Sequence, residues 1–219
     1  NLGVMHLATV LTDTDSLSPS TVSQGFPVTV VVTVQSTNPS SADAVSATVA
    51  AVTQLPGNLV TLFSAPSPAS QTVAALATQR FTYIYTATSV GSVTFSHTVT
   101  ATNPDTGALI SLAPINSPLL TVNPAAQLGS AISASPTVVS VGQELTVIMT
   151  VTNSGRAVAN NTLSQLTVLP GGLLNLVQGP TSKTIGVGLT DSFTYRYSAA
   201  SPGSVSFSGN AVGTDGLNP

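Results

Sequence analysis

The side chains that could carry acid–base or metal chemistry are few and far apart in this chain. Its 219 residues include two histidines, His6 and His97, and no cysteine. Histidine is the natural general base near neutral pH, but no serine and acid pattern surrounds His97. Two distant imidazoles without a thiolate are too few for a transition-metal site. We therefore expect no enzyme activity, no catalytic, cofactor-binding or metal residues, and a structural or surface role for both histidines.

Asp13 and Asp15 place two carboxylates two residues apart. Carboxylate oxygens at that spacing could help to hold Ca²⁺ at a joint between two modules. The alternative is a solvated turn between strands, in which both carboxylates contact water. We favour the solvated turn.

Aromatic residues recur with a spacing of two in two rows. An exposed row of this kind could stack on sugar rings, whereas a buried row would belong to a core, with the tyrosine hydroxyls reaching a partner at its rim. We favour the core. The rows are Phe81, Tyr83 and Tyr85, and Phe193, Tyr195 and Tyr197.

Asn160 begins Asn160-Asn161-Thr162, the one N-x-S/T sequon of the chain. In a secreted protein such a sequon is a possible glycosylation site. Because Ser and Thr are frequent, glycans on hydroxyl groups are a second possibility, and the sequence does not choose between them.

The chain is unusually poor in charge. Charged residues make up 5% of it, against roughly 25% of ordinary soluble proteins. The four cations, Arg80, Arg156, Lys183 and Arg196, are scattered, whereas a nucleic-acid surface needs several cations on one face. No apolar run is long enough to cross a membrane. The composition suits a protein that buries much of its surface against neighbours, and it excludes nucleic acid as a partner.

Strict alternation of apolar and polar residues predicts strands throughout. Val28, Val30, Val32 and Val34 share one face of such a segment. β-Branched residues dominate these segments, and turn signals rich in Pro, Gly and Asn separate them. No segment has a sustained helical period. We therefore expect an all-β fold of antiparallel sandwiches.

The chain repeats itself. Residues 81–107 and 193–219 share 12 identities in 27 aligned positions without a gap. We expect a boundary at the linker Asn123-Pro124, which gives two tandem domains, 1–124 and 125–219. The first copy continues through the apolar stretch Ala108–Val122, and the second has no equivalent of it. The sequence therefore predicts that the second sandwich lacks its final strand.

Three segments of the second copy carry a family resemblance: Val141–Val147, Val151–Gly155 and Val168–Leu173. Their motifs are a glycine-led strand, a Val-Thr-Asn-x-Gly turn and a Leu-Pro-x-Gly segment. This order of motifs resembles that of the Ig-like surface repeats of bacteria and archaea of the DUF11 and CARDB (cell-adhesion-related) type. The first copy is more divergent. The resemblance implies seven-stranded sandwiches in a surface or filament protein, and it implies no catalytic residue.

Residues 1–11 are apolar on both faces, which predicts a strand covered on both sides. We expect this strand to insert into the incomplete domain of another copy, so that the chain is a structural subunit of a prokaryotic extracellular filament that polymerises head to tail by donor-strand complementation. The expected donor residues are Leu2, Val4, Met5, Leu7, Val10 and Leu11.

Two other functions remain open. The chain could be a fragment of a tandem-repeat adhesin stalk, or a carbohydrate-binding accessory module. The expected location is the cell surface in each case. Because the chain begins at Asn1 without an initiator Met, we expect either a removed export signal or a trimmed chain.

Overall fold

The computed structural model describes residues 9–37, 45–50, 52–103 and 107–217, and within these ranges all regular structure is β-strand. The chain divides into two compact units, Asn1–Asn123 (unit 1) and Pro124–Pro219 (unit 2). The division falls one residue before the boundary that the sequence predicts.

The first layer of unit 1 is a four-stranded antiparallel sheet. Its strand order is β1 (Leu11–Ser18), β3 (Pro27–Ser36), β8 (Thr78–Ala87) and β6 (Val60–Ser64). The alternation that the sequence shows in β3 decides its orientation, because Val28, Val30, Val32 and Val34 are all buried and the residues between them are partly exposed. Such alternation is expected for a sheet with one face on a core.

The second layer of unit 1 consists of two separate short sheets. One has the order β11 (Leu109–Ser111), β10 (Val99–Thr102), β4 (Val45–Val49) and β7 (Ser70–Val73). The other has the order β12 (Ile115–Asn116), β9 (Gly91–His97), β13 (Leu120–Asn123) and β2 (Thr21–Ser23), with β5 (Thr53–Leu55) also paired to β9.

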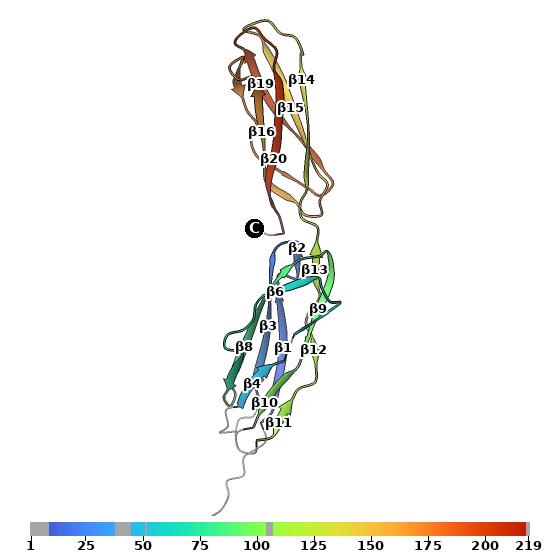
Figure 1. The fold of residues 1–219 in the computed structure, drawn as a ribbon, viewed down its shortest axis with the longest axis vertical. Coiled ribbons are helices and arrows are strands. Elements are labelled where there is room, and N and C mark those ends of the chain that lie inside the picture. Colours follow the sequence, from blue (N-terminus) through green and yellow to red (C-terminus); the bar gives the residue numbers. More distant parts are fainter. Residues whose placement is uncertain (1–8, 38–44, 51, 104–106, 218–219) are drawn as a thin grey trace, which may run out of the picture. The chain divides into compact units, whose positions relative to one another are not determined.

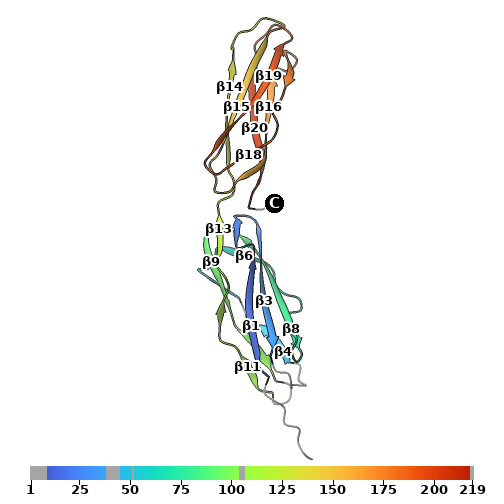
Figure 2. The ribbon, with the colours of Figure 1, turned by 180° about the vertical axis from the view of Figure 1, so that it is seen from behind.

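Unit 2 repeats the first layer and only part of the second. Its first layer has the order β14 (Leu128–Ser135), β15 (Glu144–Asn153), β19 (Thr190–Ala199) and β17 (Leu174–Gln178). Its second layer is a three-stranded sheet of β18 (Lys183–Ile185), β16 (Ala159–Leu169) and β20 (Ser206–Asp215). Figures 1 and 2 show these long strands from two sides.

The first layer has the strand order β1-β3-β8-β6 in unit 1 and β14-β15-β19-β17 in unit 2. Both orders correspond to strands A, B, E and D of an Ig-like sandwich. The all-β fold class with two tandem Ig-like antiparallel sandwiches is therefore confirmed. β13 of unit 1 has no counterpart among residues 124–217, so the final strand is absent from the described part of unit 2, as predicted.

The two aromatic rows lie inside the units. Phe81 and Phe193 are fully buried, and all four tyrosines of the rows are buried as well. In unit 2 the hydroxyl of Tyr195 donates to the backbone oxygen of Ser164 at 2.8 Å. The core interpretation of these rows is confirmed, and they offer no exposed face for stacking on a sugar.

The core of unit 2 is the smaller one. Among the described residues, the core cluster holds 21 buried apolar residues in unit 1 and 9 in unit 2. Residues of β16 and β20 that face this second core, such as Leu166 and Phe207, are only partly buried. The open second layer of unit 2 accounts for the difference.

Candidate functional site

In unit 1 the strand β13 closes the second layer. It runs antiparallel to β9, with Leu120 opposite Val93, and parallel to β2, with Val122 opposite Val22. All four of these side chains are buried. β13 therefore fills a slot between β9 and β2 with two apolar side chains that are two residues apart.

In unit 2 the counterparts of the two slot walls line a groove. Residues 203–205 match residues 91–93 of β9, and residues 138–140 match β2. Neither segment of unit 2 is a strand. Both border a groove of about 830 Å³ that no described residue of unit 2 occupies. Apolar side chains on its walls include Val139, Val205, Leu174 and Phe207.

The burial of matched residues measures what β13 contributes. Val93, Phe95 and Val22 of unit 1 are completely buried. Their counterparts in unit 2, Val205, Phe207 and Val139, are partly exposed. Because the residue types are the same in each pair, the covering strand and not the residue type makes the difference.

The groove also has exposed apolar residues at its mouth. Val138 is 87% exposed and Val141 is 56% exposed. The strand β20 pairs with β16 along one edge, and it is the edge strand of the three-stranded sheet within the described residues. An unprotected edge beside apolar side chains is a template for strand addition.

The expected donor residues fall into two groups. Leu2, Val4, Met5 and Leu7 lie outside the described residues. Val10 and Leu11 are described, and here the prediction is wrong. The carbonyl oxygen of Val10 accepts a hydrogen bond from the Thr37 amide at 3.0 Å, and Leu11 is the first residue of β1, is paired with Ser36 and is 5% exposed. Leu11 therefore belongs to the sheet of its own unit, and Val10, which precedes β1, is bonded within the same unit through its carbonyl oxygen.

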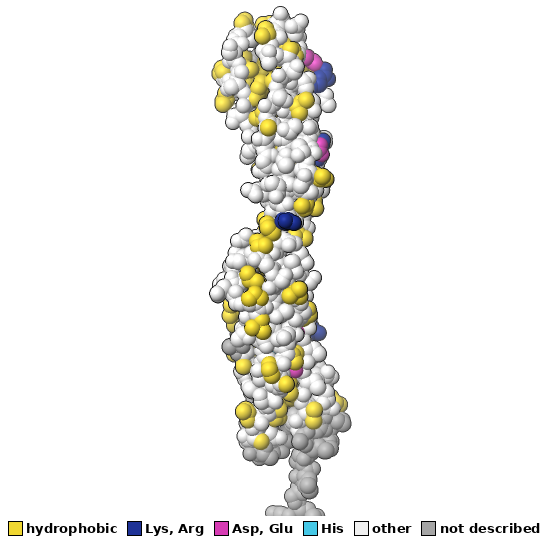
Figure 3. Space-filling view, turned by 90° about the vertical axis from the view of Figure 1, so that its right-hand side faces the viewer, with side chains coloured by type: hydrophobic (Ala, Val, Ile, Leu, Met, Phe, Trp, Pro, Cys, Tyr) yellow, Lys and Arg dark blue, Asp and Glu magenta, His cyan; other side chains and the backbone are white. Residues whose placement is uncertain are grey.

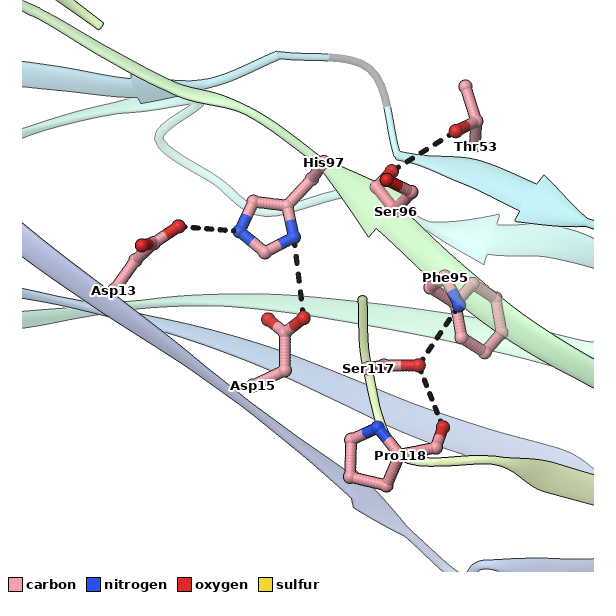
Figure 4. A network of polar contacts seen from close by, with 8 residues as sticks. All are labelled: Asp13, Asp15, Thr53, Phe95, Ser96, His97, Ser117 and Pro118. Carbon is pink, nitrogen blue, oxygen red and sulfur yellow. Dashed lines mark hydrogen bonds and ion pairs between the residues drawn. The ribbon is translucent and has the colours of Figure 1, made fainter. Parts of the chain in front are cut away.

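A second polar cluster lies inside unit 1. Both ring nitrogens of His97 face carboxylates of β1: Nε2 lies 3.1 Å from Asp13 Oδ2, and Nδ1 lies 3.4 Å from Asp15 Oδ2. Figure 4 shows the two carboxylates pointing at the imidazole from one strand. The side chains of His97, Asp13 and Asp15 are 1%, 7% and 2% exposed. The expected solvated turn at Asp13 and Asp15 is therefore wrong, because both residues belong to a strand that faces the core.

Burial changes the acidity of one carboxyl group in this cluster. Burial, and to a smaller extent the neighbouring Asp13 carboxylate, raise the pKa of Asp15, and the attraction to His97 offsets part of that rise. No group of three His, Cys, Asp or Glu residues that could hold a metal ion is present among the described residues. No sequence pattern predicts this cluster, because His97 is 84 residues from Asp13 and only the fold brings them together.

Asn160 is half-buried in β16, next to Asn161, whose φ is +48°. The pairing of β16 with β20 is irregular at this point. Thr162 is buried, and its hydroxyl donates to the Ala159 carbonyl oxygen at 3.2 Å. Glycosylation of Asn160 stays a prediction.

The surface is nearly free of charge. On the face drawn in Figure 3, charged side chains are few and lie apart, and hydrophobic side chains are scattered among uncharged polar groups. Within the described residues no helix is long and apolar enough to cross a membrane.

Comparison with known proteins gives only distant structural likenesses. No family model and no curated protein matches the chain, so the resemblance to DUF11 and CARDB repeats stays a prediction. Among solved structures, the chain is similar to a Salmonella α-2-macroglobulin reacted with methylamine, with 13% identity and a TM-score of 0.35 over 96% of this chain and 15% of that one. The chain thus spans less than a fifth of that macroglobulin.

Two further likenesses are to a chain of a pilus assembly complex and to an adhesin. The chain is similar to a chain of the CsuC–CsuE chaperone–tip adhesion subunit pre-assembly complex from archaic Csu pili of Acinetobacter baumannii, with 12% identity and a TM-score of 0.29 over 94% of both chains. It is also similar to the Yersinia pseudotuberculosis adhesin InvE, with 14% identity and a TM-score of 0.27 over 91% of this chain and 58% of that one. These TM-scores are low, so the fold assignment rests on the strand pairing of the chain itself.

Proposed function

We propose that this chain is a non-enzymatic structural subunit of an extracellular filament, and that unit 2 of one copy accepts a strand from the N-terminal segment of the next. The observation that carries the proposal is the groove of unit 2. It is bordered by residues 203–205 and 138–140, the counterparts of the two segments that pair with β13 in unit 1. Because apolar side chains line the groove walls, an apolar and uncharged strand fits them.

The N-terminal segment has that chemistry. Residues 1–8 contain no Lys, Arg, Asp or Glu, and four of them are Leu, Val or Met. The donor strand that we propose ends before Thr9, because Thr9 is buried and the carbonyl oxygen of Val10 already bonds within unit 1. The donor set is thereby reduced to Leu2, Val4, Met5 and Leu7.

Such a contact is head to tail, so it adds subunits without closing unless the rotation between them happens to form a ring. Each buried aliphatic side chain of the donor stabilises the junction by about 1.5–3 kcal/mol, and backbone hydrogen bonds to β20 add to this. The near absence of surface charge suits subunits that are packed against neighbours.

Removal of residues 1–8 tests the proposal. The deletion leaves every described residue in place, and circular dichroism checks that the shortened chain is folded. We expect filaments from the full chain in electron micrographs and single particles from the shortened chain, with filaments restored when residues 1–8 are returned. Filaments of normal length from the shortened chain would contradict the proposal.

One alternative uses the same groove. In a tandem-repeat adhesin stalk, the covering strand would come from residues that follow Pro219 in a longer polypeptide. The mass of the native chain separates the two functions. A mass near 21.9 kDa supports strand exchange between subunits, and a much larger mass supports the stalk.

A further inference from the structure

We propose that the groove of unit 2 selects a strand in one direction and one register, and that it recognises a Leu-x-Val pattern. The inference deepens the proposed function and rests on its premise that unit 2 takes up a strand. It is carried by the internal repeat, since unit 1 contains the filled form of the same site.

The direction follows from the pairing of β13. This strand is antiparallel to β9 and parallel to β2. Transposed to unit 2, the accepted strand runs antiparallel to residues 203–207 and parallel to residues 138–140. Uptake of the strand therefore also gives residues 138–140 a partner with which to form the short strand that β2 forms in unit 1.

The register follows from two apolar side chains. Leu120 lies opposite Val93 and Val122 lies opposite Gly91. The corresponding positions in unit 2 are Val205 and Gly203. We therefore infer that a Leu side chain packs beside Val205 and Phe207, and that a Val two residues later sits between Gly203 and Val139, as Val122 lies between Gly91 and Val22.

The end of the groove at Gly203 is already shaped for this register. A Cβ placed on Gly203 would lie 2.6 Å from Leu173 Cδ1, and one placed on Gly91 would lie 3.1 Å from Leu59 Cδ1. Both glycines also have a positive φ, +152° and +147°. Because the same glycine–leucine contact exists with and without the covering strand, this part of the acceptor does not have to rearrange.

The N-terminal segment contains one match to the pattern. Leu2-Gly3-Val4 has the spacing of Leu120-Thr121-Val122, and no other Leu-x-Val occurs in residues 1–11. We therefore assign Leu2 to the position of Leu120 and Val4 to that of Val122. Gly3 and Met5 then fall on the opposite face of the donor strand.

Peptide binding to the chain that lacks residues 1–8 tests this assignment. Two labelled peptides are titrated by fluorescence anisotropy: residues 1–9, and residues 116–124, which contain β13. We expect both to bind. In the first peptide, Leu2→Ser and Val4→Ser should each weaken binding at least tenfold, and the control Gly3→Ser, on the opposite face and outside the donor set, should change it less than threefold.

A variant of the acceptor supplies the second control. Val139→Asp in the groove should abolish binding of both peptides, whereas Val177→Asp, at an exposed position of β17, should leave it unchanged. Circular dichroism and the unfolding midpoint establish that both variants are folded.

The outcomes separate this inference from the proposed function. Binding of the β13 peptide alone would keep the groove as a Leu-x-Val acceptor and overturn the N-terminal segment as donor. Binding of neither peptide would overturn the acceptor site itself. Loss of binding on Gly3→Ser but not on Leu2→Ser would overturn the register.

Discussion

The two units share one sheet and differ in the other. The first layers have the same strand order, and even the turn before the second long strand is the same, since Gly25 and Gly142 both have a positive φ and donate to Ala87 and Ala199. The second layers differ by β13. In the shared sequence pattern Gly-Ser-Val-x-Phe, the Val and the Phe are therefore buried at 93 and 95 and partly exposed at 205 and 207. The two units therefore carry matching wall residues, and among the described residues a strand of the chain lies between these walls in unit 1 alone.

A second difference lies where β9 and β20 face the first layer. Unit 1 has His97 between Asp13 and Asp15, and unit 2 has Gly209, Ser130 and Ile132 at the matching positions. A Cβ on Gly209 would lie 2.5 Å from the Gln165 carbonyl oxygen. Unit 2 thus packs this region closely without ionisable groups, and unit 1 packs it with three.

The largest effect is expected at the matched phenylalanines. Phe95→Ala should destabilise unit 1 by about 3–5 kcal/mol, because the Phe95 side chain is fully buried in the core of this unit. Phe207→Ala should cost unit 2 about half of that or less in single subunits, because Phe207 is partly exposed there. Hydrogen exchange in increasing denaturant reports each unit through its own peptides. Equal losses in the two units would mean that the groove is closed in solution.

The next-largest loss of stability is expected at Asn153, the last residue of β15. Asn153 is buried, accepts from the Gln127 and Gly155 amides, and donates to the Ala157 and Ile185 carbonyl oxygens. Asn153→Ala should therefore destabilise unit 2 by about 2–4 kcal/mol, since it leaves several buried groups unpaired.

Ser36 occupies the matching position in unit 1 and supplies the control. It is buried, and its hydroxyl has no hydrogen-bond partner among the described residues. Ser36→Ala should change the stability of unit 1 by less than about 0.5 kcal/mol, or raise it. A large loss on Ser36→Ala would contradict this comparison.

The units should also differ in their response to pH. The pKa of Asp15 is raised in the folded state, mainly by burial. A raised folded pKa contributes stability that is fully present below the ordinary pKa of 3.8 and is lost as the pH rises through the folded value. The stability of unit 1 relative to an Asp15→Asn variant should therefore fall as the pH rises across this window. A difference that is constant with pH would contradict the buried carboxylate.

The smallest effect is expected at the exposed pair of unit 2. Lys183 Nζ lies 2.6 Å from Asp191 Oδ1, and this hydrogen bond lowers the pKa of Asp191. The sign is opposite to that of Asp15, because a lowered folded pKa contributes stability above the ordinary pKa that is lost as the pH falls. Since solvent screens exposed pairs strongly, Lys183→Ala should leave the unfolding midpoint of unit 2 nearly unchanged. A marked loss that high salt abolishes would show that this pair matters more than we expect.

Much of the fold could be predicted from the sequence, because alternation fixes which face of a strand is buried. Val28–Val34 and the aromatic rows follow that rule, and the turn at Asn153-Ser154-Gly155 carries its own reason, since a Cβ on Gly155 would lie 2.2 Å from the Ala125 carbonyl oxygen. The cluster around His97 could not be predicted, because it depends on strands distant in sequence. The run that is apolar on both faces continues to Leu11, the first residue of β1, so the sequence pattern alone does not separate Val10 and Leu11 from the donor segment.

Hydrogen exchange of filaments against single subunits tests the central claim most directly. If unit 2 accepts a strand, residues 138–140 and 203–207 should exchange quickly in the chain that lacks residues 1–8 and slowly in filaments of the full chain. Residues 21–23 and 91–95 of unit 1 should be protected equally in both. Equal protection of the unit 2 segments in the two samples would contradict the account.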